Sequence, residues 1–80
     1  MLKMSPAQCR AARAFLGLTQ SQLAHAAGLG LSTVVDFEKE RRQVSEEVVA
    51  AMSTALQQCG VRFIDESGWQ GIRVRNPGIR

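Results

Sequence analysis

Two short helical patterns, 19–27 and 31–38, are separated by three residues and constrain the fold of this 80-residue chain more than any other feature. Thr19 is followed three residues later by Gln22, which is the capping-box spacing that starts a helix. The connection 28–30 reads Gly-Leu-Gly, which ends the first helix and favours a tight turn with one apolar residue between the two helices.

The second segment has one apolar and one polar face. Val34 and Phe37 lie three residues apart, so a helix places them on the same buried side. Ser32, Thr33 and Asp36 fall on the opposite side, which faces solvent. A helix, a short turn containing glycine and a second helix with small polar residues facing outward is the layout of a helix-turn-helix.

Two longer helices flank this motif. Ser5-Pro6 is typical of a helix start, and the helix runs to about Leu16. Its apolar stripe is expected to contain Cys9, Ala12, Phe15 and Leu16. Ser45, followed by two glutamates, starts another helix that ends at Gly60. Its core positions repeat at three and four residues and are Val48, Val49, Met52, Ala55, Leu56 and Cys59.

In 61–63 and in 72–75, apolar residues alternate with arginines, which predicts a β-hairpin. The turn is expected over 65–68, and Asn76-Pro77-Gly78 is expected to end the second strand. A lone two-stranded hairpin is marginally stable in water, so this one must pack on the helices or pair with a second copy. The residues expected at a dimer contact are Val61, Phe63, Ile64, Trp69, Ile72 and Val74, with a cap over the core as the alternative for the tryptophan.

The predicted architecture is therefore mainly α and consists of one domain. A compact four-helix unit occupies residues 1–60, and a C-terminal hairpin and tail occupy 61–80. No signal-peptide pattern is present, and no stretch approaches the ~20 apolar residues of a membrane helix. A cytoplasmic protein without a membrane partner is expected.

The charge distribution favours an anionic partner. The formal net charge is +3 at pH 7, which suits a polyanion but is not specific to nucleic acid. The basic residues are regional, in two groups that consist of Lys39, Arg41 and Arg42, and of Arg73, Arg75 and Arg80.

Catalytic and metal chemistry have no support in the sequence. Cys9 and Cys59 lie far apart without a histidine cluster, so no zinc site is expected, and both are interpreted as small buried apolar residues. A disulfide or a redox role is the alternative. His25 has no second ligand and is interpreted as a surface residue. No nucleophile with a base and no phosphate-binding glycine loop occurs, so we expect no enzyme, no cofactor and no small-molecule substrate.

A set of short motifs carries a family resemblance. They are Leu18-Thr19-Gln20-Ser21-Gln22-Leu23-Ala24, Ala27-Gly28-Leu29, Ser32-Thr33-Val34, Asp36-Phe37-Glu38 and Arg41-Arg42. Together they resemble the Cro/phage-repressor (XRE) helix-turn-helix family over residues 5–60. The resemblance implies a phage-repressor-like four-helix domain and a transcriptional regulator that binds specific sequences of double-stranded DNA.

The resemblance also implies residue roles. Thr19 and Gln20 would lie at the DNA, where Gln20 contacts a phosphate and orients the recognition helix 31–38; the alternative is a solvated helix terminus. The residues implied to reach base edges or nearby phosphates are Leu31, Ser32, Thr33 and Asp36. Those implied to contact the sugar-phosphate backbone are Lys39, Arg41 and Arg42. A solvated surface is the alternative for Asp36 and for these basic residues. Arg13 and Glu38 match the positions of an interior ion pair.

Three residues depart from the family pattern. Gly30 stands where a capping Ser or Thr is usual, Leu31 where a polar side chain often reads bases, and Glu40 where Gly is common. An apolar contact between Leu31 and a thymine methyl is one consequence. The base preference is therefore not predicted.

The leading functional hypothesis is a homodimer that places two recognition helices in successive major grooves, about 34 Å apart, on an inverted repeat. A monomer makes too few base contacts for strong discrimination, which favours dimerisation. The alternative is an antitoxin or adaptor that binds a protein partner through the hairpin in 61–80.

Overall fold

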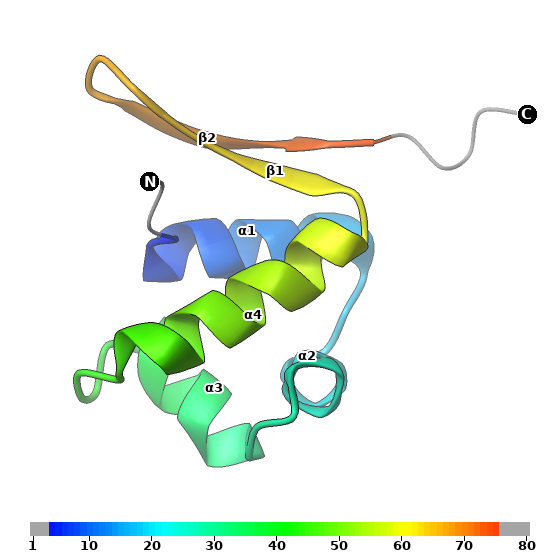
Figure 1. Ribbon diagram of the computed structural model, residues 1–80, viewed down its shortest axis with the longest axis vertical. Helices are drawn as coiled ribbons and strands as arrows, with labels where there is room; N and C mark the ends of the chain where they lie inside the picture. Colours follow the sequence, from blue (N-terminus) through cyan, green and yellow to red (C-terminus); the bar gives the residue numbers. More distant parts are fainter. Residues whose placement is uncertain (1–3, 76–80) are drawn as a thin grey trace, which may run out of the picture.

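The computed structural model describes residues 4–75, which form four helices and a two-stranded antiparallel sheet (Figure 1). In chain order the elements are α1 (Pro6–Leu16), α2 (Gln20–Ala27), α3 (Leu31–Glu38), α4 (Glu46–Gln58), β1 (Val61–Glu66) and β2 (Trp69–Val74). The prediction of a mainly α fold with a C-terminal hairpin is confirmed. Arg80 and the segment Asn76-Pro77-Gly78 lie outside the described residues. No helix within 4–75 is both long and apolar enough to span a bilayer.

Capping side chains determine where three of the helices begin. The N-cap residues Ser5, Thr19 and Ser45 each accept a hydrogen bond from the backbone N–H three residues later, at 3.1, 3.0 and 3.2 Å. Helix α3 differs because its N-cap is Gly30, which has no side chain to accept such a bond. Gly28 ends α2 with a φ of 71°, a left-handed conformation that costs glycine little.

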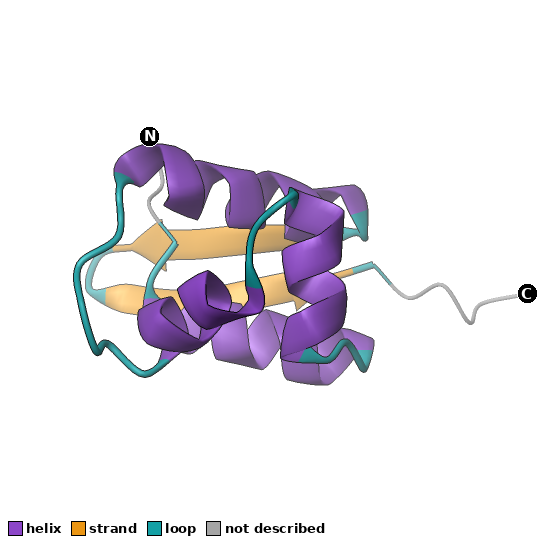
Figure 2. Ribbon diagram, turned by 90° about the horizontal axis from the view of Figure 1, so that it is seen from below, coloured by secondary structure: helices purple, strands orange, loops and turns teal. Residues whose placement is uncertain are grey.

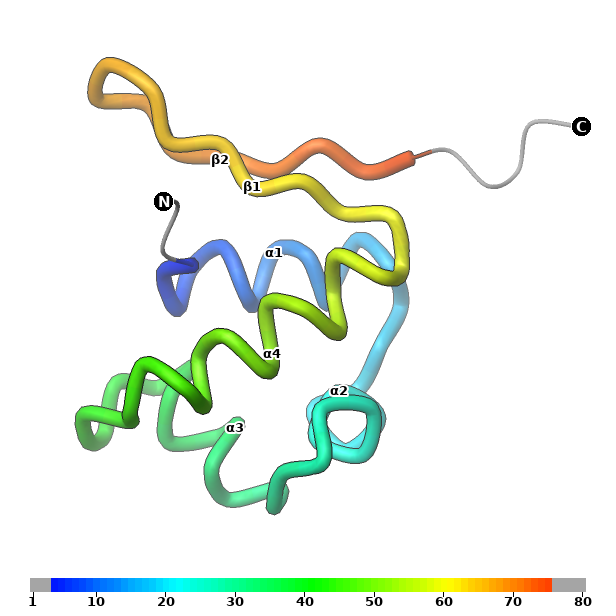
Figure 3. Tube along the Cα trace, in the orientation of Figure 1, coloured from blue at the N-terminus to red at the C-terminus, as the bar shows by residue number. Residues whose placement is uncertain are grey.

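The elements form three layers. The hairpin lies on one side, α1 and α4 lie beneath it, and α2 and α3 lie on the side away from the hairpin (Figure 1). β1 packs on α4 and β2 packs on α1. Figure 2 shows the two strands behind the helices in the view from below, and the trace in Figure 3 shows the same separation between the hairpin and α3. The hairpin and α3 therefore lie on opposite sides of the molecule.

The core lies between these layers and includes the first half of β1. Its side chains at 0% exposure are Cys9, Ala12, Leu23, Val34, Met52, Leu56 and Val61. Burying one aliphatic side chain of this kind contributes about 1.5–3 kcal/mol. Phe63 is 8% exposed and belongs to the same cluster. The hairpin is thus part of the domain core rather than an appendage.

A buried glutamine fastens the hairpin to α1. The side chain of Gln8, which is 4% exposed, donates from Nε2 to the carbonyl oxygens of Ile64 and Gly71, both at 3.0 Å. These two residues face each other across the strands. Because a buried amide must find partners, this contact holds the middle of the sheet at one place over α1.

Two predicted core positions are wrong. Cys59 is exposed, because α4 ends at Gln58 and the cysteine lies at its C-cap, where the chain turns toward β1. Phe15 is 73% exposed. Helix α1 turns Ala12 and Leu16 toward the core, whereas Phe15 lies to the side of this stripe.

The hairpin turn is shorter than predicted. Ser67 and Gly68 alone form it, with φ of 49° and 83°, while Glu66 already pairs with Trp69. Two successive positive φ values are typical of a type I′ turn, whose twist matches that of the strands. Asp65 therefore belongs to β1 instead of the turn.

Candidate nucleic-acid interface

Helix α3, which lies on the side of the molecule away from the hairpin, carries small polar side chains at its start. Val34 and Phe37 anchor the helix in the core, with 0% and 8% exposure. Leu31 and Ser32 are exposed, and Thr33 is half-buried. Small side chains let a helix backbone come close to the base edges, so this face has the character of a helix that enters a major groove.

The start of α3 also offers unpaired backbone donors. Because Gly30 has no capping side chain, the N–H groups of Leu31 and Ser32 have no hydrogen-bond partner within residues 4–75. The N–H of Thr33 bonds to the carbonyl of Gly30 at 3.1 Å. Free amides at the positive end of a helix dipole attract anions such as phosphate.

Asp36 is paired with an arginine from the following loop. Arg42 donates from Nε to Oδ2 of Asp36 at 2.9 Å, and the two side chains are 53% and 23% exposed. The pair offsets a carboxylate that would otherwise repel DNA phosphates. Exposed pairs of this kind contribute about 0–1 kcal/mol, so Arg42 can leave Asp36 for a phosphate at little cost.

Besides Arg42, the loop after α3 carries the exposed cations Lys39 and Arg41. Between them, Glu40 adopts a φ of 55°, and the N–H of Arg41 donates to the carbonyl of Asp36 at 2.9 Å. The loop therefore ends α3 with the left-handed residue that is usually a glycine. Here Glu40 takes that conformation, at a cost of about 1–2 kcal/mol.

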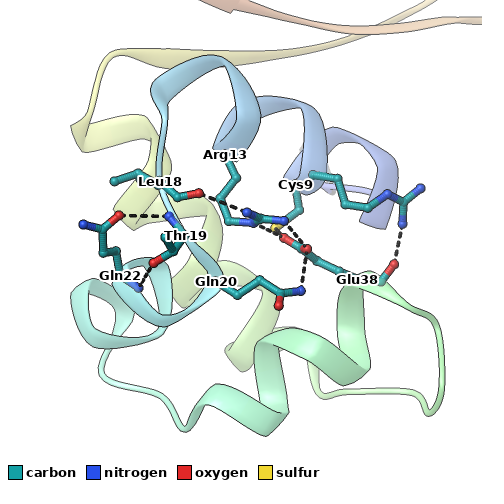
Figure 4. Close-up of polar contacts among 8 residues, drawn as sticks. Cys9, Arg13, Leu18, Thr19, Gln20, Gln22 and Glu38 are labelled. Atoms are coloured by element: carbon teal, nitrogen blue, oxygen red, sulfur yellow. Dashed lines mark hydrogen bonds and ion pairs between the residues drawn. The ribbon is translucent and has the colours of Figure 1, made fainter.

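At the end of α3, a buried carboxylate joins this helix to α1 and α2 (Figure 4). Glu38 is 1% exposed and accepts two hydrogen bonds from Arg13, from Nε to Oε2 and from Nη2 to Oε1, both at 2.8 Å. Arg13 also donates from Nη1 to the carbonyl of Leu18 at 3.0 Å. Arg13 and Glu38 thus form an ion pair that joins α1 and α3.

The hydrogen bonds keep Glu38 ionised. Burial by itself raises the pKa of this carboxyl, but the hydrogen bonds from Arg13, Gln20 and Cys9 outweigh burial and lower the pKa below its ordinary value. The hydrogen bond to Glu38 also raises the pKa of Arg13. No buried side-chain nitrogen or oxygen within residues 4–75 lacks a hydrogen-bond partner, so the network is fully satisfied.

Gln20 takes part in the same network. Its Nε2 donates to Oε1 of Glu38 at 3.0 Å, so the side chain connects the start of α2 with the end of α3. Thr19 is engaged in capping α2, and its own N–H donates to Oε1 of Gln22 at 2.9 Å (Figure 4). Both residues lie at the start of α2, but their side chains are already committed to protein contacts.

Sequence reasoning missed two members of the network. Cys9 donates from Sγ to Oε2 of Glu38 at 3.2 Å, and Arg10 donates to the backbone carbonyl of Glu38. Burial and the adjacent carboxylate raise the pKa of the Cys9 thiol, which therefore stays protonated and able to donate. The four-residue spacing from Cys9 to Arg13, one helical turn, is the signal that places both on the same side of α1. No group of three or more metal-binding side chains occurs within residues 4–75.

The residues predicted at a dimer contact differ in exposure. Val61 and Phe63 are buried in the chain's own core, and Ile72 and Val74 pack partly against it. Among the predicted group, Trp69 is 77% exposed. Side chains of the inner face are therefore unavailable to a second copy, and a contact must use the strand backbones or the outer face.

Comparison with known families identifies the arrangement. A family model described as a helix-turn-helix matches residues 10–64, from the first turns of α1 into β1. No curated protein matches the chain.

Proposed function

The chain belongs to the Cro/phage-repressor (XRE) family of helix-turn-helix DNA-binding regulators, and from this premise we propose that it binds an inverted-repeat operator as a homodimer. The face of α3 supports the proposal, because small polar side chains and free backbone amides converge there. Occupancy of the operator regulates transcription in the cytoplasm. The proposal includes no catalytic step.

The proposed contacts divide into two kinds. Leu31, Ser32 and Thr33 lie at the start of α3, where side chains reach base edges and decide which sequence is bound. Lys39 and Arg41 extend from the loop after α3 to the sugar-phosphate backbone, where they increase affinity for any sequence. Asp36 accepts from a cytosine amino group or remains paired with Arg42, and Thr19 and Gln20 place the start of α2 against a phosphate.

The geometry favours dimerisation through an edge of the sheet. Glu66 and Trp69 flank the two-residue turn and form a hydrogen-bonded pair, and in an antiparallel ladder every second pair is hydrogen-bonded. The backbone N–H and C=O groups of the intervening residues therefore point away from the partner strand; these residues are 61, 63 and 65 in β1 and 70, 72 and 74 in β2. Within residues 4–75 these edge groups are unpaired. Pairing one edge with a second copy turns the copies about an axis perpendicular to the sheet. Both α3 helices then stay on the same side and can enter the same duplex.

A double substitution tests the role of α3. Changing Ser32→Glu and Thr33→Glu places two negative charges where the helix meets DNA. We expect affinity for the selected operator to fall at least about 100-fold, which corresponds to about 2.7 kcal/mol. Thermal stability should stay near that of the parent, because carboxylates are favourable in the first turn of a helix.

A matched control carries the same charges on another helix. Ser53→Glu with Thr54→Glu alters neighbouring positions of α4 and should leave DNA affinity nearly unchanged. Fluorescence anisotropy with a labelled operator measures both variants. A folded Ser32→Glu/Thr33→Glu protein that binds as tightly as the control would remove α3 from the interface.

The free strand edges also favour a second candidate, an antitoxin or adaptor that binds a protein through the hairpin. An extended segment of a partner can add a strand to such an edge. Co-purification of one defined partner that is lost when Ile72→Pro blocks the β2 edge, together with absence of DNA binding, would favour this function over a self-contained regulator.

A further inference from the structure

The outer face of the hairpin carries a pattern that neither the core nor the DNA interface uses. Side chains alternate along each strand, and Val61 and Phe63 face the core. The remaining set therefore faces away from the helices, in three cross-strand pairs: Arg62 with Arg73, Ile64 with Gly71, and Glu66 with Trp69. One end of this face is basic, its middle carries the single side chain of Ile64 opposite a glycine, and its tip carries an acid and an aromatic ring.

The charged side chains of this face have no partners within the described residues, and its aromatic ring is uncovered. Arg62 and Arg73 stand directly opposite each other, an arrangement of like charges that is unfavourable in a sheet. Neither guanidinium has a hydrogen-bond or ion-pair partner within residues 4–75, and the same holds for the carboxylate of Glu66. Trp69 is 77% exposed, although a large aromatic side chain gains most from being covered.

We propose that the outer face of the hairpin binds the outer face of a second copy, and that this back-to-back contact joins two DNA segments. The occupant follows from charge complementarity. A two-fold axis that crosses the strands at the Ile64–Gly71 pair reverses the order of the pairs along the strands. Arg62 then lies over Glu66 of the second copy, and Arg73 lies over Trp69 of the second copy.

The two spacings along the strands are equal, so the charged residues of the two copies fall in register. Arg62 and Glu66 are each two residues from Ile64, about 7 Å along the strand, and Arg73 and Trp69 are each two residues from Gly71. Stacked sheets lie about 10 Å apart, within reach of an arginine from one sheet and a glutamate or tryptophan from the other. At the centre, a Cβ at Gly71 would meet nothing within 4 Å, which leaves room for the Ile64 side chains.

The layer order determines what such a contact does. The hairpin and α3 lie on opposite sides of the α1 and α4 layer (Figure 1). Two copies stacked through their hairpins therefore direct their α3 helices away from each other, so they cannot enter successive grooves of one duplex. They hold two separate segments, while the strand edges remain free for the dimer on each operator. The bridging role rests on the proposed function, whereas the self-association does not.

The contact is small and acts when copies are concentrated. A face of two short strands is well below the interface size of a stable dimer, so free protein should associate weakly. Copies bound to sites on one DNA molecule are tethered, which raises their effective concentration. The net positive charge of the face also makes an acidic protein segment an alternative occupant, and the test separates the two.

The test uses charge exchange between the two ends of the face. Glu66→Arg and Arg62→Glu should each weaken self-association of the full chain at least 10-fold, and the double variant should restore it to within 3-fold of the parent. Asp65→Arg is the matched control, because it makes the same charge change next to Glu66 but on the inner face of the strand. Sedimentation velocity without DNA measures association. Trp69 is the single tryptophan of the chain, so its fluorescence emission should shift to shorter wavelength as the protein concentration increases and the copies associate.

Bridging is measured with two fragments that each carry the selected operator, one immobilised and one labelled. The parent, the Asp65→Arg control and the double variant should retain the labelled fragment, and each single variant should lose it at unchanged affinity for one operator. An association that is unaffected by Glu66→Arg, or a double variant that stays defective, would overturn the proposal. So would a parent whose Trp69 emission is independent of concentration, the result expected if an acidic partner is the occupant. Failure of DNA binding with intact charge-dependent association would instead count against the proposed function alone.

Discussion

Replacing Glu38 by glutamine should destabilise the domain strongly, although the change removes no volume. The carboxylate accepts at both oxygens, from Arg13 and Gln20 at Oε1 and from Arg13 and Cys9 at Oε2. An amide has only one oxygen, so its NH₂ group must face donors at the other position. Arg13 also loses the charge that compensates its own.

The magnitude follows from burial. Breaking a buried ion pair by neutralising one partner costs about 3–5 kcal/mol. The Arg13 side chain keeps 20% exposure to water, which favours the lower end, about 3 kcal/mol. A domain of this length has a total stability of about 4–12 kcal/mol. The Tm should therefore fall by about 12–24 °C.

Urea unfolding followed by circular dichroism measures the change. Glu40→Gln is the matched control, since it makes the same substitution two residues away on an exposed side chain and should stay within about 0.5 kcal/mol of the parent. A loss of unfolding free energy below about 1 kcal/mol for Glu38→Gln, with an unaltered dependence of that free energy on urea concentration, would refute the view that this network holds α3 in place.

Three further predictions concern other parts of the chain. Acid should destabilise the parent more than the Glu38→Gln variant. The pKa of Glu38 is lowered in the folded state, so its ionised form contributes stability that is complete above about pH 4.5 and is lost as the pH falls through the folded-state pKa. Unfolding midpoints of both proteins across that pH range measure the difference. A thiol reagent should modify exposed Cys59 in the native protein and Cys9 only after unfolding, since Cys9 is buried and its pKa is raised; mass spectrometry locates the label. Ser67→Asn should stabilise the hairpin by about 0.5–1 kcal/mol in thermal unfolding, because asparagine tolerates the φ of 49° better than serine.

Local signals explain how much of the fold was predictable. Ser5, Thr19 and Ser45 mark helix starts because a hydroxyl cap acts on amides three residues away, within reach of sequence inspection. The same holds for Gly28 and the turn to α3. Cys59 was misplaced because helical periodicity was carried one residue past the end of α4, where the chain leaves the helix.

Contacts between distant segments were less accessible. The pairing of Gln8 with the two strand carbonyls depends on how the sheet lies over α1, and its position between Ala7 and Cys9 gives no sign of it. Likewise, Gln20 was expected at a phosphate, and its bond to Glu38 emerges only once α2 and α3 are packed together. The alternation of apolar and charged residues predicted the two faces of the strands. Which residues of β1 lie opposite which residues of β2 on the outer face became known only from the strand register in the structure.

The most direct test of the central claim, that α3 carries a sequence-specific DNA interface, is enrichment of genomic fragments by the purified chain, followed by anisotropy on the best fragment at several salt concentrations. We predict one or a few inverted-repeat sites, bound by two copies, with an affinity that falls steeply as salt increases because phosphate contacts release counterions. Enrichment no better than background, or binding that is equal for all sequences, would contradict the claim.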